Sequence, residues 1–225
     1  MSSRTYKDTH KDAYDYTHKD AYNYPYNELG FEDALAAQAV FREVMNAFAH
    51  PLKIYRINRG AAGSGESAPI RGESAPIMEL CRVFLDNAVS FYVDNDEELA
   101  ATIREQTYAA TAGLEDAGFV ILKDPENFGA WGSIRQGSLV DPHKGATVIV
   151  GVPQIAGGTS ITAEGPGIDG KATFLMDHVV AGCARIAAGL DREYPKGFEL
   201  IFVSYEGDIC ALPRHVRILY EGGGR

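Results

Sequence analysis

The chain has 225 residues, of which 45% are hydrophobic, which is enough to build one domain with a substantial core. Acidic residues outnumber lysines and arginines by 31 to 21, and the formal net charge is -10. A surface of this sign repels phosphate backbones, so we expect no nucleic acid and no membrane among the partners. The sequence contains no apolar run of about 18 residues and no secretory leader, which predicts a cytoplasmic protein.

The N-terminal segment differs from the rest of the chain in carrying a tandem repeat. Residues 9–16 read THKDAYDY and residues 17–24 read THKDAYNY. Because the segment lacks apolar periodicity, we expect a mobile tail over residues 1–27. His10 and His18 are eight residues apart in this repeat, a spacing that does not place them on one helix face, so we expect no metal site.

A second duplication lies further along the chain. The heptapeptide GESAPIR ends at Arg71, and GESAPIM follows directly. Glycine, proline and polar residues dominate this region, which predicts a flexible loop inserted at about residues 60–76. We expect a single α/β domain over residues 28–220, followed by a short tail at residues 221–225.

The first predicted helix of the domain is Glu32–His50, which ends before Pro51 because the residue preceding a proline avoids helical geometry. Its large apolar side chains recur at steps of three and four residues and predict one buried stripe. That stripe contains Leu35, Val40, Phe41, Val44, Met45 and Phe48.

The remaining pattern alternates between helices and strands. We expect helices at residues 78–85, 96–107 and 174–190, and strands at residues 52–57, 89–93, 118–122, 146–152, 160–163, 199–204, 209–212 and 216–219. The runs TVIV and LIFV are apolar at every position, as in central strands that are covered on both faces. The sequence therefore predicts an α/β domain in which helices flank a mixed central sheet.

The segment GPGIDGKAT at Gly165–Thr173 matches two glycine-rich phosphate-loop patterns, and we place it between a strand and a helix. However, Ala172 stands where a phosphate loop has the Ser or Thr that binds magnesium, and Pro166 lacks an N–H donor. We interpret the segment as a glycine turn. An independent nucleotide-dependent enzyme that uses Gly165–Lys171 remains the alternative.

Other sequence patterns that could indicate catalytic residues are weaker signals. The three cysteines, Cys81, Cys183 and Cys210, lie in apolar stretches, and we expect buried, reduced thiols. Asp177 and His178 are neighbours, so on a helix they point about 100° apart and form no relay. The sequence thus predicts no catalytic residues.

Candidate ligand contacts are few. Arg214 follows Pro213 between two predicted strands, where its guanidinium either holds an anion or pins the strands through a salt bridge. Together with Gly165 and Gly167, it is the candidate anion contact.

The predicted helix at residues 174–190 carries small side chains that suit close helix packing. We therefore expect a homodimer contact on the stripe that includes Asp177, Ala184 and Arg185.

Five blocks in fixed order resemble the PhnH family, the H subunits of bacterial carbon–phosphorus lyase. They are VFREVMNAFAHP at residues 40–51, CRVFLDNAVSF at 81–91, GSLVDPHKGATVIVGV at 137–152, ITAEGPGI at 161–168, and YPKGFELIFV with GDICALPR between residues 194 and 214. The sequence departs from the family at His215 and Val216, where two threonines are common.

The resemblance implies a fold related to pyridoxal-phosphate transferases but without the cofactor, so we expect no cofactor. It also implies a non-catalytic subunit that works with the G, I and J subunits. In that pathway a phosphonate is first attached to the ribose of ATP in place of adenine. The H subunit is needed at this stage, although no catalytic residues are established for the family.

Removing residues 1–27 should leave folding intact, because a segment without an apolar face buries little area. Thermal unfolding of the full-length and truncated chains, followed by circular dichroism, should give midpoints that agree within a few degrees. A much lower midpoint for the truncated chain would show that the tyrosines of the repeat pack on the domain.

Overall fold

A computed structural model describes residues 31–57, 72–190 and 193–219. The repeat-bearing segment, most of the 60–76 insert and residues 221–225 lie outside this range, so the expectations for them stay predictions. Across the described residues, no helix is long and apolar enough to cross a membrane.

The centre of the molecule is a mixed seven-stranded sheet with the order β1-β9-β8-β5-β4-β2-β3. Strands β3, β2, β4, β5 and β8 run parallel to one another, whereas β9 is antiparallel to both β8 and β1. The bounds are β1 (Tyr55–Arg56), β2 (Ser90–Val93), β3 (Ala110–Thr111), β4 (Phe119–Leu122), β5 (Thr147–Val152), β8 (Glu199–Ser204) and β9 (Asp208–Leu212).

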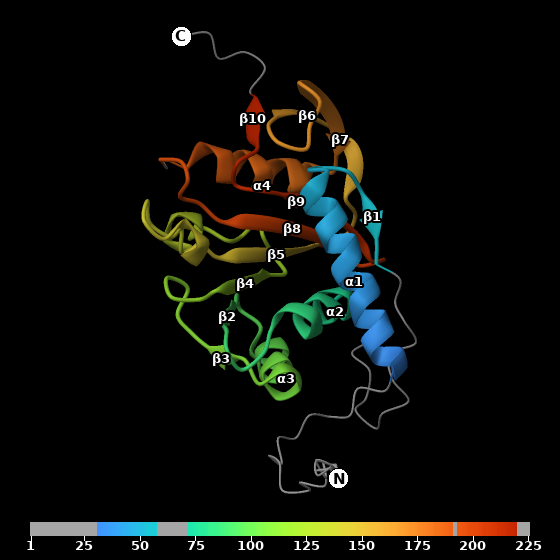
Figure 1. Ribbon diagram of the computed structural model, residues 1–225, viewed down its shortest axis with the longest axis vertical. Coiled ribbons are helices and arrows are strands. Elements are labelled where there is room, and N and C mark those ends of the chain that lie inside the picture. Colours follow the sequence, from blue (N-terminus) through green and yellow to red (C-terminus); the bar gives the residue numbers. More distant parts are fainter. Residues whose placement is uncertain (1–30, 58–71, 191–192, 220–225) are drawn as a thin grey trace, which may run out of the picture.

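Helices cover both faces of this sheet. One face packs against α1 (Phe31–Ala49), α2 (Ala75–Phe84) and α3 (Glu97–Thr107), and the other packs against α4 (His178–Gly189) (Figure 1). Side chains of the central strands alternate between the two layers. Val148 and Val150 contact the α4 layer, whereas Ile149 contacts the layer of α1–α3, and all three are fully buried. The fold is therefore a layered α/β domain, as the sequence predicts.

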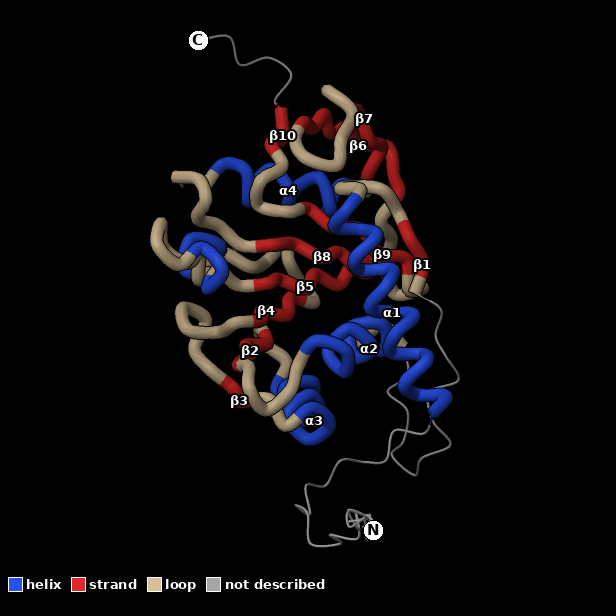
Figure 2. Tube along the Cα trace, viewed as in Figure 1, coloured by secondary structure: helices blue, strands red, loops and turns tan. Residues whose placement is uncertain are grey.

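A second, three-stranded antiparallel sheet has the order β10-β6-β7 and packs on the α4 side. It consists of β6 (Ala156–Glu164), β7 (Lys171–Met176) and β10 (Arg217–Leu219), and it lies at the end of the molecule opposite α3 (Figure 1). Two short 3₁₀ turns, Trp131–Ser133 and Pro142–Lys144, interrupt the long connection between β4 and β5 (Figure 2).

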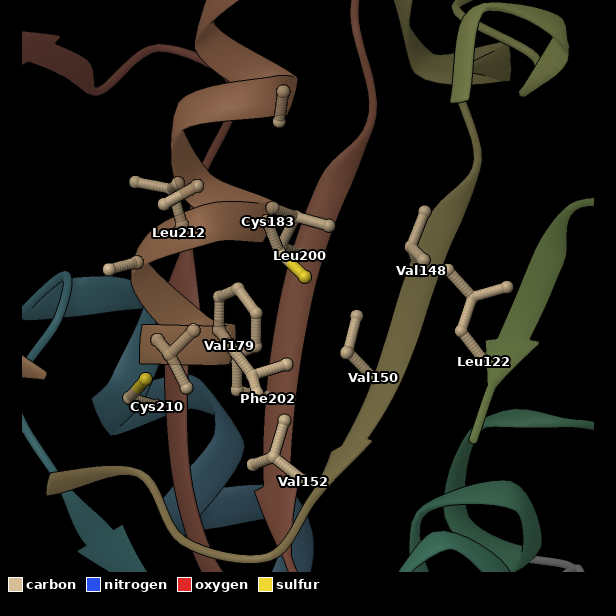
Figure 3. Packing of buried hydrophobic residues seen from close by; sticks show 14 of the residues in the cluster. Leu122, Val148, Val150, Val152, Val179, Cys183, Leu200, Phe202, Cys210 and Leu212 are labelled. Atoms are coloured by element: carbon tan, nitrogen blue, oxygen red, sulfur yellow. The ribbon is translucent and has the colours of Figure 1, made fainter. Parts of the chain in front are cut away.

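The core between α4 and the sheet is apolar and closely packed. Val179 and Cys183 of α4 lie over Phe202 and Leu200 of β8 (Figure 3). Burial of each such large apolar side chain contributes roughly 1.5–3 kcal/mol before the entropy of folding is counted. This contact explains why α4 is fixed on the sheet.

The prediction of one long helix at residues 174–190 is wrong in its first part. Phe174, Leu175 and Met176 belong to β7, where they pair with β6, and the helix begins only at His178. Asp177 separates the two elements because its carboxylate accepts a hydrogen bond from the Val179 N–H, which caps the helix. The run of three apolar residues suits either a strand or a helix, and the pairing with β6 decides the outcome.

The predicted stripe of α1 is only partly buried. Val44 is inaccessible to solvent, but Leu35, Phe41 and Met45 are 49%, 46% and 44% exposed. The buried face of α1 consists of Val40, Val44 and Ala47, each at most 2% exposed. The stated stripe of six residues is therefore too wide.

Smaller differences concern the first strand and the second helix. Only Tyr55–Arg56 pairs as a strand within the predicted 52–57 segment, because Leu52 has φ 63° and breaks the extended geometry. Helix α2 begins at Ala75, three residues before the predicted start, with Pro76 in its first turn. The second copy of the GESAPI repeat thus ends inside a helix.

The prediction that Ala184 lies on a dimer stripe of α4 is wrong. Ala181, Ala184 and Ala187 face the protein's own core, and each is at most 3% exposed. The small side chains allow the helix to approach the sheet.

Ala184→Glu should therefore prevent folding, or lower the free energy of unfolding by more than about 3 kcal/mol, because it buries an unpaired carboxylate. Ile186→Glu is the matched control, since Ile186 is 44% exposed on the same helix and the change should cost less than about 1 kcal/mol. Urea unfolding followed by circular dichroism measures both. Equal stability of the two variants would contradict the inward packing of α4.

Candidate functional site

The glycine-rich segment Gly165–Lys171 forms the hairpin turn between β6 and β7. The prediction that it precedes a helix is wrong, and the strand-to-helix context of a phosphate loop is absent at this turn. Lys171 starts β7 with an exposed side chain whose Nζ lies 3.9 Å from Glu164 Oε2. The lysine thus faces a carboxylate across the hairpin.

Close packing accounts for two of the glycines. Gly165 has φ 146°, and a Cβ there would lie 3.1 Å from the Val216 Cα. Gly167 has φ 84°, and a Cβ there would lie 2.5 Å from the Ala49 carbonyl oxygen. Of the three candidate contacts, Gly165 therefore lies beside the segment that carries Arg214, whereas Gly167 packs on the end of α1.

Arg214 forms a salt bridge with Glu199. The Arg214 Nε lies 2.6 Å from Glu199 Oε1, and the Arg214 backbone N–H donates to Oε2 at 2.7 Å. Both side chains are only 19% exposed. Nη1 also donates to the carbonyl oxygens of Pro142 and Gly197. Of the two roles that the sequence leaves open, a salt bridge is present, but it joins Arg214 to the start of β8 rather than pinning β9 and β10, the two strands that flank Arg214.

Arg214 also lines a surface cleft with a volume of about 440 Å³. The cleft lies between the end of α4, the segment before β8, and the β9–β10 connection with β10. Its lining consists of Ala188, Leu190, Tyr194, Lys196, Arg214, His215, Val216, Arg217 and Ile218. This volume falls in the usual range for small-molecule sites, roughly 300–1,000 Å³.

The lining is cationic in a protein whose net charge is strongly negative. Its described residues include two arginines, one lysine and one histidine, and none of these described lining residues is an Asp or Glu. Arg217 Nη1 lies 3.2 Å from Glu164 Oε1, and the Arg217 side chain of this pair is exposed to solvent. Lys196 is half-buried and forms no ion pair with the residues that the structure describes.

Asp177 and His178 do come into contact, contrary to the sequence-based expectation. His178 Nδ1 lies 3.3 Å from Asp177 Oδ1, and Nε2 lies 3.6 Å from Glu126 Oε1. The geometry arises because Asp177 is the N-cap with an extended backbone, so its side chain turns back over the first helical turn. Burial alone raises the Asp177 pKa, but hydrogen bonds from the Val179 N–H and Gln154, together with His178, bring it below its usual value.

This Asp–His pair does not extend into a nucleophilic or metal-binding cluster within the described part of the chain. The cysteines are free and buried, as predicted. Burial raises the pKa of Cys81, Cys183 and Cys210 to about 12. They are therefore thiols at neutral pH, whereas a cysteine nucleophile must be a thiolate.

Sequence reasoning does not place Arg217 or Lys196 in the lining of a cleft with Arg214. The available signal is the run Arg214, His215, Val216, Arg217, which places three basic side chains within four residues. Nothing local in the sequence connects this run to Lys196.

The fold and the cleft define a mixed α/β protein with a small cationic site at the rim of its sheet. The model of the family described as bacterial phosphonate metabolism protein (PhnH) matches residues 29–219. The chain belongs to this family, as the five sequence blocks indicate.

Two curated relatives are similar over most of their length. A protein of Stutzerimonas stutzeri named as a candidate C-P lyase subunit, HtxG, is 27% identical over 185 residues, which cover 82% of this chain and 87% of the relative. The alpha-D-ribose 1-methylphosphonate 5-triphosphate synthase subunit PhnH of Rhizobium meliloti (strain 1021) is 23% identical over 190 residues, covering 82% and 91% of the two chains.

Arg214→Met should lower the free energy of unfolding by about 2 kcal/mol, because it leaves the partly buried Glu199 carboxylate without its cation. Adding Glu199→Gln should cost less than the sum of the single changes, with a coupling of at least about 1 kcal/mol. Urea titrations of the unmodified chain, the two single variants and the double variant measure this coupling as a double-mutant cycle.

Arg217→Met is the control, since its pair with Glu164 is exposed and should contribute less than about 1 kcal/mol. If the Arg214 and Glu199 changes are additive, the salt bridge does not hold the strand ends together.

Proposed function

We propose that this chain is a non-catalytic assembly subunit of the carbon–phosphorus lyase system for phosphonate catabolism. In this role it works with the G, I and J subunits and is needed when a phosphonate is coupled to the ribose of ATP. The match of the PhnH family across residues 29–219 carries the proposal. The relatives support it, because both are named as subunits of such systems.

The local geometry is consistent with a structural role. Several groups that could perform chemistry are held in packing or capping contacts: Asp177 caps α4, Arg214 is bonded to Glu199, and the cysteines are protonated inside the core.

The alternative function is an independent nucleotide-dependent enzyme that uses Gly165–Lys171. The hairpin at this segment and the ion pair of Lys171 with Glu164 favour the subunit role. The relation of the fold to pyridoxal-phosphate transferases, the lack of a cofactor, the cytoplasmic location and a homodimer of the isolated chain remain predictions.

In cells that encode this chain, deleting its gene should abolish growth on a phosphonate as the sole phosphorus source while growth on phosphate continues. A tagged copy should restore growth and co-purify the G, I and J subunits, because the proposed role is exerted within their complex. Growth curves and mass spectrometry of the purified complex give the result.

A Lys171→Ala copy separates the two functions. It should restore growth as well as the unmodified copy if the chain is a structural subunit. Loss of growth with the complex still assembled, or ATP turnover by the purified chain that Lys171→Ala abolishes, would support the nucleotide-dependent enzyme instead.

A further inference from the structure

The connection between β4 and β5, at one side of the molecule (Figure 2), carries two exposed apolar side chains in a tight turn. Leu139 is 51% exposed and Val140 is 87% exposed, the highest value among the large apolar residues that the structure describes. Two hydrogen bonds close the turn. The Ser138 N–H donates to the Asp141 carbonyl oxygen at 3.2 Å, and the Asp141 N–H donates to the Ser138 hydroxyl oxygen at 2.9 Å. The two apolar side chains therefore stand at the tip of a closed turn.

The requirements of the turn itself do not explain these two residues. Gly, Pro, Asn, Asp and Ser dominate turns, because they fit the backbone geometry or form hydrogen bonds with it. Leucine and valine do neither, and side chains this exposed remove little apolar area from water when the chain folds. Neither residue has a positive φ, so polar residues would fit the same backbone. The turn thus presents apolar surface from which the folded chain gains little.

Contacts on both sides of the turn hold its backbone in place. Gly137 precedes the turn with φ 70°, and a Cβ there would lie 2.9 Å from the Pro142 carbonyl oxygen, so the position requires glycine. After the turn, Arg214 Nη1 donates to that same Pro142 oxygen. Arg135 Nε donates to the Lys144 carbonyl oxygen. Because the backbone is already fixed in the isolated chain, little ordering entropy is lost when the tip binds a partner.

The charged groups next to the tip are paired within the chain. Lys144 Nζ lies 2.8 Å from Asp141 Oδ2, and the two side chains are 55% and 38% exposed. The Arg135 guanidinium donates to the carbonyl oxygens of Asp116 and Lys144. An uncharged apolar pocket could therefore cover the tip without burying an unpaired charge. An apolar centre bordered by exposed polar groups is the usual anatomy of a protein–protein interface.

We propose that the turn Ser138–Asp141 is a docking point for another protein subunit, with Leu139 and Val140 inserted into an uncharged apolar pocket of that subunit. The inference rests on the proposed subunit function and names a surface through which the chain assembles. Because that function places the chain in a complex, part of its surface is covered by other subunits. Removal of the exposed apolar area of Leu139 and Val140 from water stabilises this contact.

A lipid bilayer and a second copy of this chain are the competing occupants of the apolar tip. The formal net charge of -10 opposes approach to an anionic lipid surface. A second copy would have to supply the pocket itself, but the cleft beside Arg214 is lined by lysine and arginine side chains. A different subunit with an uncharged pocket fits the tip better than either.

The probe is a preparation of the G, I and J subunits co-expressed without this chain. It is titrated into the fluorescently labelled full-length chain, and binding is followed by anisotropy. The double variant Leu139→Asn, Val140→Thr keeps the size of both side chains but makes them polar. It should bind at least about tenfold more weakly than the unmodified chain, because two apolar contacts lose their stabilisation. Its urea unfolding midpoint should stay the same, since the tip is exposed in the isolated chain.

Two further variants serve as controls. Leu175→Asn makes the same change at a leucine of β7 that is 63% exposed, and it should leave the affinity within about twofold of the unmodified value. Val140→Thr alone alters a side chain that is 87% exposed and should weaken binding at least about threefold without affecting folding. The affinity of Val140→Thr decides the outcome if the double variant is less stable than the unmodified chain.

The docking point is overturned if the unmodified chain and the tip variants bind the G, I and J subunits equally well, or if Leu175→Asn weakens binding as much as they do. It is also overturned if the double variant keeps full subunit affinity but loses sedimentation with phosphatidylserine-containing vesicles, or loses self-association of the isolated chain. In those cases the subunit role itself stands. If the unmodified chain does not bind these subunits at all, the subunit role fails, and the docking point fails with it.

Discussion

The central strands of the larger sheet are apolar on both faces, and this double burial is the constraint on which the rest of the structure depends. Val148 and Ile149 point to opposite sides of β5, and both are inaccessible to solvent. A sheet of this kind requires a covering layer on each face. Helices α1–α3 form one layer, and α4 with the smaller sheet forms the other. Polar groups are consequently displaced to the rim, where the connections between the layers run.

The cleft lies at this rim because of strand register. Leu200 of β8 pairs with Leu212 of the antiparallel β9, so the start of one strand lies beside the end of the other. This places Glu199 and Arg214 at the same edge and lets them form their salt bridge. The β9–β10 connection also packs closely on the hairpin at Gly165, where a Cβ would lie 3.1 Å from the Val216 Cα. A packing requirement thus fixes the Arg214 guanidinium in a cleft that Lys196 also lines.

Local signals predict an element well where they agree with its packing. Helix α3 begins as predicted because the Asp96 carboxylate accepts the Leu99 N–H and is held by Lys123, and Glu97 and Glu98 favour the first turn. The segment 174–176 shows the opposite case. Its apolar residues fit the periodicity of a helix and that of a strand equally well. Pairing with strand β6 decides that the segment is a strand. Similarly, the spacing of Phe41 and Met45 indicates a helix face but not whether a neighbour covers it.

The sequence by itself determined the layered α/β class, the doubly covered central strands, the buried cysteines and the family, because periodicity and ordered blocks are local properties of the chain. Tertiary structure decided that Arg214 meets Glu199, that Asp177 contacts His178, and that Lys196 and Arg217 share one cleft. The physical reason is that these contacts depend on strand register, on the end of α4 and on the hairpin at Gly165, which no short stretch of sequence encodes. The site is therefore a product of packing between segments that lie far apart in the chain.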